Sequence, residues 1–244
     1  MNQLKNKRGQ VTLFIIIAII IVAVALVWIF LWSPVKSQRE GLDKQATDVR
    51  DYVSLSLKNS LENALAIVGL QGGFISPEKP FIQYDNLTVA YWLYNNTGHW
   101  PEIEDIEKEL DKFVLSSLPS CDKIKENFQL KKIECGNAEA KIIIQNNSIV
   151  TYVNYSISVT DKTTIKIKPD YQYKLEINFS EYYKIGMYIL KNYNCLTCLG
   201  KKAVEENLTI RQIDMGDTLF NFIIDDKIKL AGMQEYILQF AIQK

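Results

Sequence analysis

The sequence predicts an α+β protein with an N-terminal transmembrane helix, a helical stalk and a mostly antiparallel sheet domain containing two or more helices. Three observations lead to this fold class: an uninterrupted apolar run near the N-terminus, an apolar stripe at helical spacing behind it, and short strand-like segments over the rest of the 244 residues. The predicted divisions are a tail at 1–10, a transmembrane helix at 11–32, an amphipathic stalk at 33–69 and an extracytoplasmic domain at 70–244.

The first helix is predicted from residues 11–32, which contain no charged side chain. At about 1.5 Å per residue this segment is roughly 33 Å long, enough to cross the hydrocarbon core of a bilayer. It is longer than a secretory signal core, so we expect it to remain in the protein as an anchor in membrane lipid. Lys5, Lys7 and Arg8 precede it and favour a cytosolic N-terminus, although Lys36 and Arg39 lie close on the other side.

The stalk is predicted from apolar residues that recur every three or four positions, as on one face of a helix. These residues are Leu42, Ala46, Val49, Val53, Leu57, Leu61, Ala64 and Val68. Gly69 is expected to end the helix, with Gly72 and Gly73 in the loop behind it. We expect the C-terminal end of the stripe to pack on the chain's own sheet, and its part nearer the membrane to meet sister chains or other surface proteins.

The domain at 70–244 is predicted to be a meander of strands with inserted helices. Strands are expected at 88–94, 129–134, 141–145, 149–159, 163–167, 171–179, 208–213, 219–225 and 236–243, and helices at 101–117 and 180–192. The pair Asn146-Asn147 predicts a hairpin, because asparagine tolerates positive φ, and Asp161-Lys162 predicts a second turn.

The side of the membrane is predicted from asparagine triplets and cysteines. Asn-x-Ser/Thr triplets are more frequent than random placement of 17 Asn and 24 Ser and Thr would give, and all lie beyond the anchor. They begin at Asn86, Asn95, Asn146, Asn154, Asn178 and Asn207. Such triplets accept glycans only outside the cytosol, although an asparagine-rich β surface would also produce them incidentally.

All four cysteines also lie beyond the anchor, and structural disulfides are the default in an oxidising compartment. We prefer Cys121 with Cys135 and Cys195 with Cys198, among three possible connectivities. A redox role for the second pair would need a thiolate at a helix N-terminus, whereas this pair follows a predicted helix. A zinc site would need a second closely spaced pair. Free thiols, a redox pair and a metal site are the alternatives to structural disulfides.

No catalytic, metal or cofactor site is predicted. His99 is the one histidine and stands in a loop-like segment, so an ordinary exposed side chain is expected. The acidic run at 102–111 reads as the solvated face of a helix. Lysine plus arginine and aspartate plus glutamate number 28 each, so we expect no nucleic-acid partner.

The first residues resemble the class III signal of archaeal type IV pilin-like proteins, through Lys7-Arg8-Gly9-Gln10 directly before an apolar helix. That resemblance implies cleavage between Gly9 and Gln10 and assembly through the apolar helix. The family usually carries Glu five residues into the mature helix, where this chain has Phe14.

The chain as a whole resembles a group of uncharacterised, N-terminally membrane-anchored surface proteins of small-genome archaea. The segments that carry this resemblance are residues 8–16, 69–74, 120–121, 195–200 and 239–241. It implies a location and an architecture but no activity.

The sequence therefore predicts a single-pass cell-membrane protein with an extracytoplasmic domain and a structural, adhesion or pilin-like assembly role, without catalysis. The alternative is an extracytoplasmic enzyme or a thiol-redox protein that uses Cys195 and Cys198. The ligand or partner, the oligomeric state, the processing after Gly9 and the use of the triplets by glycans are not fixed by the sequence.

Overall fold

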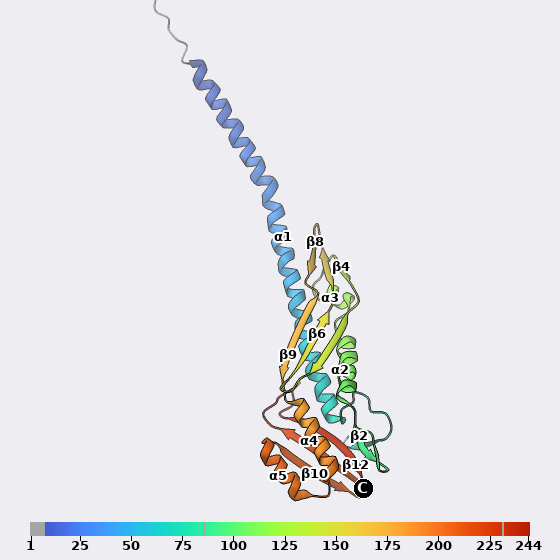
Figure 1. The fold of residues 1–244 in the computed structure, drawn as a ribbon. Coiled ribbons are helices and arrows are strands. Elements are labelled where there is room, and N and C mark those ends of the chain that lie inside the picture. The colour runs from blue at the N-terminus through green and yellow to red at the C-terminus, as the bar shows by residue number, and fades with distance from the viewer. Residues whose placement is uncertain (1–7, 85, 231) are drawn as a thin grey trace, which may run out of the picture.

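The computed structural model describes residues 8–84, 86–230 and 232–244, without the side chains of 8–17 and 29–40 (Figure 1). The helices are α1 (Arg8–Leu70), α2 (Ile103–Ser117), α3 (Cys121–Asn127), α4 (Phe179–Asn192) and α5 (Leu196–Glu206). The strands are β1 (Phe81–Tyr84), β2 (Leu87–Tyr94), β3 (Thr97–Gly98), β4 (Lys132–Cys135), β5 (Glu139–Ile144), β6 (Ser148–Asn154), β7 (Ile157–Thr160), β8 (Thr164–Ile167), β9 (Asp170–Glu176), β10 (Thr209–Met215), β11 (Thr218–Asp225) and β12 (Tyr236–Gln243).

The described strands form three sheets, so the expected mostly antiparallel α+β domain is confirmed. The largest sheet has the order β1-β2-β12-β11-β10, with β3 beside β2, and only its β2–β12 pair is parallel among the described strands. The other two sheets, β4-β7-β8 and β5-β6-β9, are antiparallel throughout. The two predicted turns are found at the β5–β6 and β7–β8 connections.

The predicted transmembrane helix is not supported, and that part of the expected fold class is corrected. Where the structure describes side chains, no helix combines the length and the apolar character needed to cross a membrane. The described apolar side chains in the first half of α1 are those of residues 18–28. They cover about 16 Å of helix, roughly half of a hydrocarbon core. Residues 1–7, most of the predicted tail, lie outside the described part of the chain.

Helix α1 continues without a break past Pro34, and its second half forms the centre of the core. Every residue of the predicted stripe from Leu42 to Val68 is at most 7% exposed. The stripe packs against α2, β8, β9 and β12, and Figure 1 shows the second half of α1 running beside β8, β9 and α2 and ending where the largest sheet begins. Leu42, Val49 and Val53, in the part of the stripe nearer the predicted anchor, are covered by their own domain, and contact of this part with sister chains stays a prediction.

Three glycines determine how α1 ends: one allows a strand to approach the helix closely, and two turn the chain with positive φ. Helix α1 ends at Leu70, one residue later than predicted, because Gly69 serves as a close-approach position rather than a helix stop. A Cβ at Gly69 would collide with the carbonyl oxygen of Ile237 on β12. Gly72 and Gly73 have φ of 76° and 96° and turn the chain, and the Gly73 N–H donates to Val68 at 2.7 Å.

The strand predicted at 149–159 is two strands in different sheets. The chain leaves β6 at Asn154, and β7 begins at Ile157 in the β4-β7-β8 sheet. Tyr155 causes this change of direction, because it is only 5% exposed, its N–H donates to Pro169 and its hydroxyl donates to Pro119. An alternating pattern does not reveal such a switch, since the side chains on both sides of it are buried.

The far end of the domain is closed by aromatic packing between α4 and the largest sheet. Trp92 of β2 stacks on Phe240 of β12 at 4.1 Å, and Tyr182 of α4 stacks on Tyr236 at 5.3 Å. The Tyr182 hydroxyl donates to the buried Asp225 carboxylate at 2.6 Å. Burial, followed by the bond to Asp225, raises the pKa of Tyr182. This network fixes α4, and therefore the start of α5 behind it, on the sheet.

Candidate functional site

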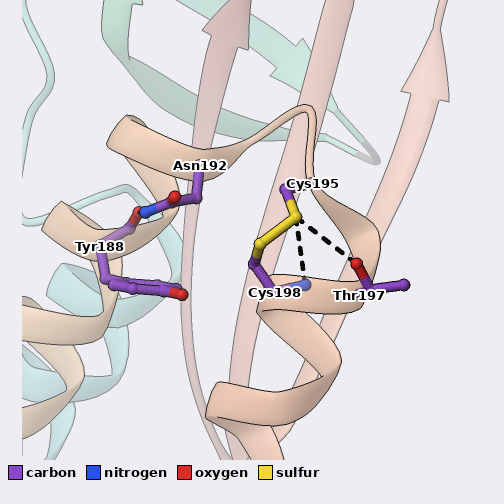
Figure 2. Close-up of a disulfide and its surroundings, with 5 residues drawn as sticks. All are labelled: Tyr188, Asn192, Cys195, Thr197 and Cys198. Atoms are coloured by element: carbon purple, nitrogen blue, oxygen red, sulfur yellow. Dashed lines mark hydrogen bonds between the residues drawn. A yellow bond between two sulfur atoms is a disulfide. The ribbon is translucent and has the colours of Figure 1, made fainter.

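The candidate site is the disulfide between Cys195 and Cys198 at the start of α5 (Figure 2). Helix α4 ends at Asn192, and Cys195 then acts as the N-cap of α5. Its sulfur accepts a hydrogen bond from the Cys198 N–H at 3.3 Å and lies 3.5 Å from the Thr197 hydroxyl oxygen. Both cysteines are partly exposed, and the Leu196 side chain between them is 72% exposed.

Helix α5 was not predicted, and the argument made from the sequence against a redox pair is wrong on this point. The pair does follow a helix, but it also opens a new one. The apolar pattern that predicts α5 is weak, because Leu199 is the one buried side chain along this helix. The sequence feature that indicates this helix is the helical spacing of Leu196, Leu199, Ala203 and Val204, since cysteine is not a favoured N-cap residue.

The second disulfide, between Cys121 and Cys135, is also partly exposed, but it joins two different elements of the fold. It joins the first residue of α3 to the last residue of β4, and these two cysteines are 14 residues apart in sequence. The structure has the preferred connectivity for both pairs, and none of the four cysteines is free.

The first described part of α1 is an exposed apolar surface. Seven aliphatic side chains between Ile19 and Val27 are each 56–62% exposed; they are Ile19, Ile20, Ile21, Val22, Val24, Leu26 and Val27. Figure 1 shows this part of α1 projecting away from the sheets. At 3.6 residues per turn these residues point in all directions around the helix, so the surface has no polar side.

All six triplet asparagines are exposed, as glycan acceptors must be. Asn86, Asn95 and Asn207 have φ of 64°, 51° and 56°, a conformation that asparagine adopts more readily than most residues. Asn146 lies in the β5–β6 turn, Asn154 at the end of β6, and Asn178 directly before α4. Local backbone geometry therefore explains three of these asparagines, while exposure keeps glycosylation open for all six.

The resemblance to a class III signal concerns residues at the edge of the described chain. Gly9 and Gln10 lie in the first turn of α1, and their side chains are outside the described ones. The processing site stays a prediction.

The acidic face of α2 contacts a strand edge. The Glu107 and Asp111 carboxylates accept the Ile144 and Ile142 N–H groups of β5 at 2.7 and 2.6 Å. Burial raises the pKa of Asp111, while the bond from Ile142 opposes that shift. These carboxylates occupy N–H groups at the outer edge of the β5-β6-β9 sheet, which blocks pairing with another strand.

The residues weighed for catalysis or metal binding lie apart. His99 directly follows β3 and is exposed, and its backbone N–H donates to the Trp92 carbonyl. Among the described residues, no group of three His, Cys, Asp or Glu side chains could hold a metal ion.

A groove over β5, β6 and β9 is lined by Tyr152, Lys141 and Gln172, with Arg50 at its side. Arg50 is engaged there, since it donates to the Lys168 and Asp170 carbonyls and lies over the Tyr171 ring.

Comparison of the chain with family profiles, with curated proteins and with solved structures finds no match. The functional argument therefore rests on the geometry of the described residues.

Proposed function

We propose that the protein is an extracytoplasmic structural protein that is attached to a membrane through the apolar N-terminal part of α1. The observation that carries this proposal is the exposed aliphatic surface between Ile19 and Val27. Burying these seven side chains would contribute on the order of 10–20 kcal/mol. A soluble domain gains nothing by exposing a surface of this kind, so a binding partner that covers it is required.

Membrane lipid is the favoured partner because the apolar side chains surround the helix. A single partner helix covers one face, whereas lipid covers every face at once. The second half of α1 then supports the domain, because its stripe is buried against α2, β8, β9 and β12.

The extracytoplasmic location is supported by the two disulfides and by the exposure of all six triplet asparagines. Protease added to intact cells should cut the domain. Digestion only after lysis would contradict this location.

A pilin-like polymer is the second candidate, since a bundle of sister helices would also surround the apolar part of α1. It further requires cleavage after Gly9, which mass spectrometry of the membrane-extracted chain would detect as a mature N-terminus at Gln10. An intact N-terminus together with a monomer in detergent would exclude the polymer and leave the anchored protein.

Membrane attachment is tested by vesicle flotation of the full chain carrying Ile20→Asp and Val24→Asp. We expect the double variant to lose most of its flotation with lipid, because two carboxylates would have to enter hydrocarbon. Leu55→Asp is the matched control: Leu55 is also apolar, 56% exposed and on α1, but it lies beside the domain. Equal flotation of wild type and the double variant would overturn the proposal.

A further inference from the structure

The two disulfides hold the structure together to different extents. Cys121–Cys135 connects a helix to a strand, whereas Cys195 and Cys198 are three residues apart and belong to the same helical start. The hydrogen bonds from Cys198 to the Cys195 sulfur and from the Leu199 N–H to the Cys195 carbonyl already close this turn. The Cys195–Cys198 bond therefore joins no separate elements of the fold.

This bond is also accessible. Cys195 and Cys198 are partly exposed, and Asn194, Leu196 and Thr197 around them are exposed. Figure 2 shows the two sulfurs in the turn that leads into α5, with strands of the sheet in the background. A partly exposed disulfide within one turn, between exposed neighbours, can be reached by an extended peptide segment that carries a thiol.

The groups around the sulfurs suit a thiolate. The N–H of Cys198 points at the Cys195 sulfur, and the positive end of the α5 dipole lies in the same turn. The first turn of α5 contains no acidic residue that would repel a sulfur anion.

We propose that Cys195 and Cys198 form a thiol–disulfide exchange site whose substrates are dithiols or disulfides in other extracytoplasmic proteins. This inference goes beyond the structural role proposed above and does not depend on membrane attachment, but the choice of extracytoplasmic substrates rests on the location proposed there.

The exchange proceeds in two balanced steps. A thiolate of the partner attacks the Cys195 sulfur, which forms a mixed disulfide and releases Cys198 as a thiolate. The second thiol of the partner loses its proton and attacks the partner sulfur that is bonded to Cys195 in the mixed disulfide. This forms the partner's disulfide and releases Cys195 as a thiolate. Two electrons pass from the partner dithiol to the cysteine pair, and the protons leave to solvent or to the new thiolates. The reverse sequence reduces a partner disulfide.

The first test is reduction of the folded full-length chain by graded dithiothreitol, followed by alkylation and peptide mapping. Cys195 and Cys198 should become reduced at about tenfold or more lower reductant concentration than Cys121 and Cys135, a difference of about 30 mV or more. The circular dichroism spectrum and the melting temperature should stay close to those of the oxidised protein. Reduction of both pairs together, or only on unfolding, would overturn the proposal.

The second test is disulfide transfer to a synthetic peptide that carries two reduced thiols. The oxidised wild type should oxidise this peptide, and the Cys121→Ser/Cys135→Ser variant should do so equally if it folds. The Cys195→Ser/Cys198→Ser variant should show only the background rate of air oxidation. Transfer no faster than this background by the oxidised wild type would overturn the proposal, whatever the variants do.

Discussion

The two halves of helix α1 have similar aliphatic side chains in opposite environments. From Leu42 to Val68, the residues of the stripe are at most 7% exposed, whereas the seven aliphatic residues between Ile19 and Val27 are 56–62% exposed. The difference is in their spacing. The buried half places an apolar residue every three or four positions, which suits one covered face, and the exposed half is apolar all round. Periodicity, more than apolar content, therefore decides which half belongs to the protein's own core.

The largest effect is expected from a charge in the buried half. Leu61→Asp would place a carboxylate at a side chain that is fully buried between α1 and its neighbours. The chain cannot hydrate this charge, so the domain should lose its cooperative thermal transition. Val49→Asp should unfold the domain as well, because Val49 is also fully buried. A folded, monomeric Val49→Asp protein would show that this half is not part of the core.

A smaller loss of stability is expected from alanine at a buried leucine of α1, and a second leucine on the opposite face of the helix provides a matched control. Leu57 is 1% exposed and Leu55 is 56% exposed, although they are two residues apart. Leu57→Ala should lower the free energy of unfolding by about 2–5 kcal/mol, because it leaves a cavity in the core. Leu55→Ala should change it by less than about 0.5 kcal/mol. Urea denaturation measures both, and similar losses would contradict a one-sided stripe.

The sequence was sufficient for elements that have a clear period. The stripe of α1, the strand at 236–243 and the turn at Asn146-Asn147 are all found as predicted. Helices α3 and α5 were missed because each is short and buries one side chain, Ile124 and Leu199 respectively. For α3 so little burial leaves no apolar period to recognise, whereas α5 does carry apolar residues at helical spacing, at Leu196, Leu199, Ala203 and Val204.

The environment of the candidate site depended on contacts that are not local in sequence. The pairing of the cysteines was predicted from spacing, but the position of Cys195 at a helix N-terminus required α5 to be known. Similarly, the acidic run at 102–111 was predicted to be solvated, yet Glu107 and Asp111 accept N–H groups from β5. Such contacts join residues more than 30 positions apart, and no periodicity reports them.

The attachment of the buried half of α1 to β9 should weaken at alkaline pH. The Tyr173 hydroxyl donates to Glu62 of α1 at 3.0 Å, and burial together with this bond raises the pKa of Tyr173 to about 12. The unfolded tyrosine ionises near pH 10, so between pH 10 and 12 the unfolded state has lost a proton that the folded state retains. Stability should therefore fall as pH rises through this window.

Tyr173→Phe tests this link. It should cost about 1 kcal/mol at neutral pH, through the lost hydrogen bond, and should make the fall of the melting temperature between pH 10 and 12 less steep. Tyr171, whose pKa is raised to about 12 by burial, should keep part of the slope in the variant. A slope identical to that of the wild type would show that Tyr173 ionises equally in both states.

The smallest effect on stability is expected from a charge in the exposed half of α1. Val24→Asp alters a side chain that is 60% exposed and outside both hydrophobic clusters of the domain. The free energy of unfolding of the domain in detergent should therefore change by less than about 0.5 kcal/mol. The same residue type at Val49 is fully buried, so the two valines on one helix isolate the effect of environment from that of residue type. If Val24→Asp destabilised the domain by as much as Val49→Asp, the two halves of α1 would have to fold as one unit, and the exposed half would be part of the core rather than its attachment.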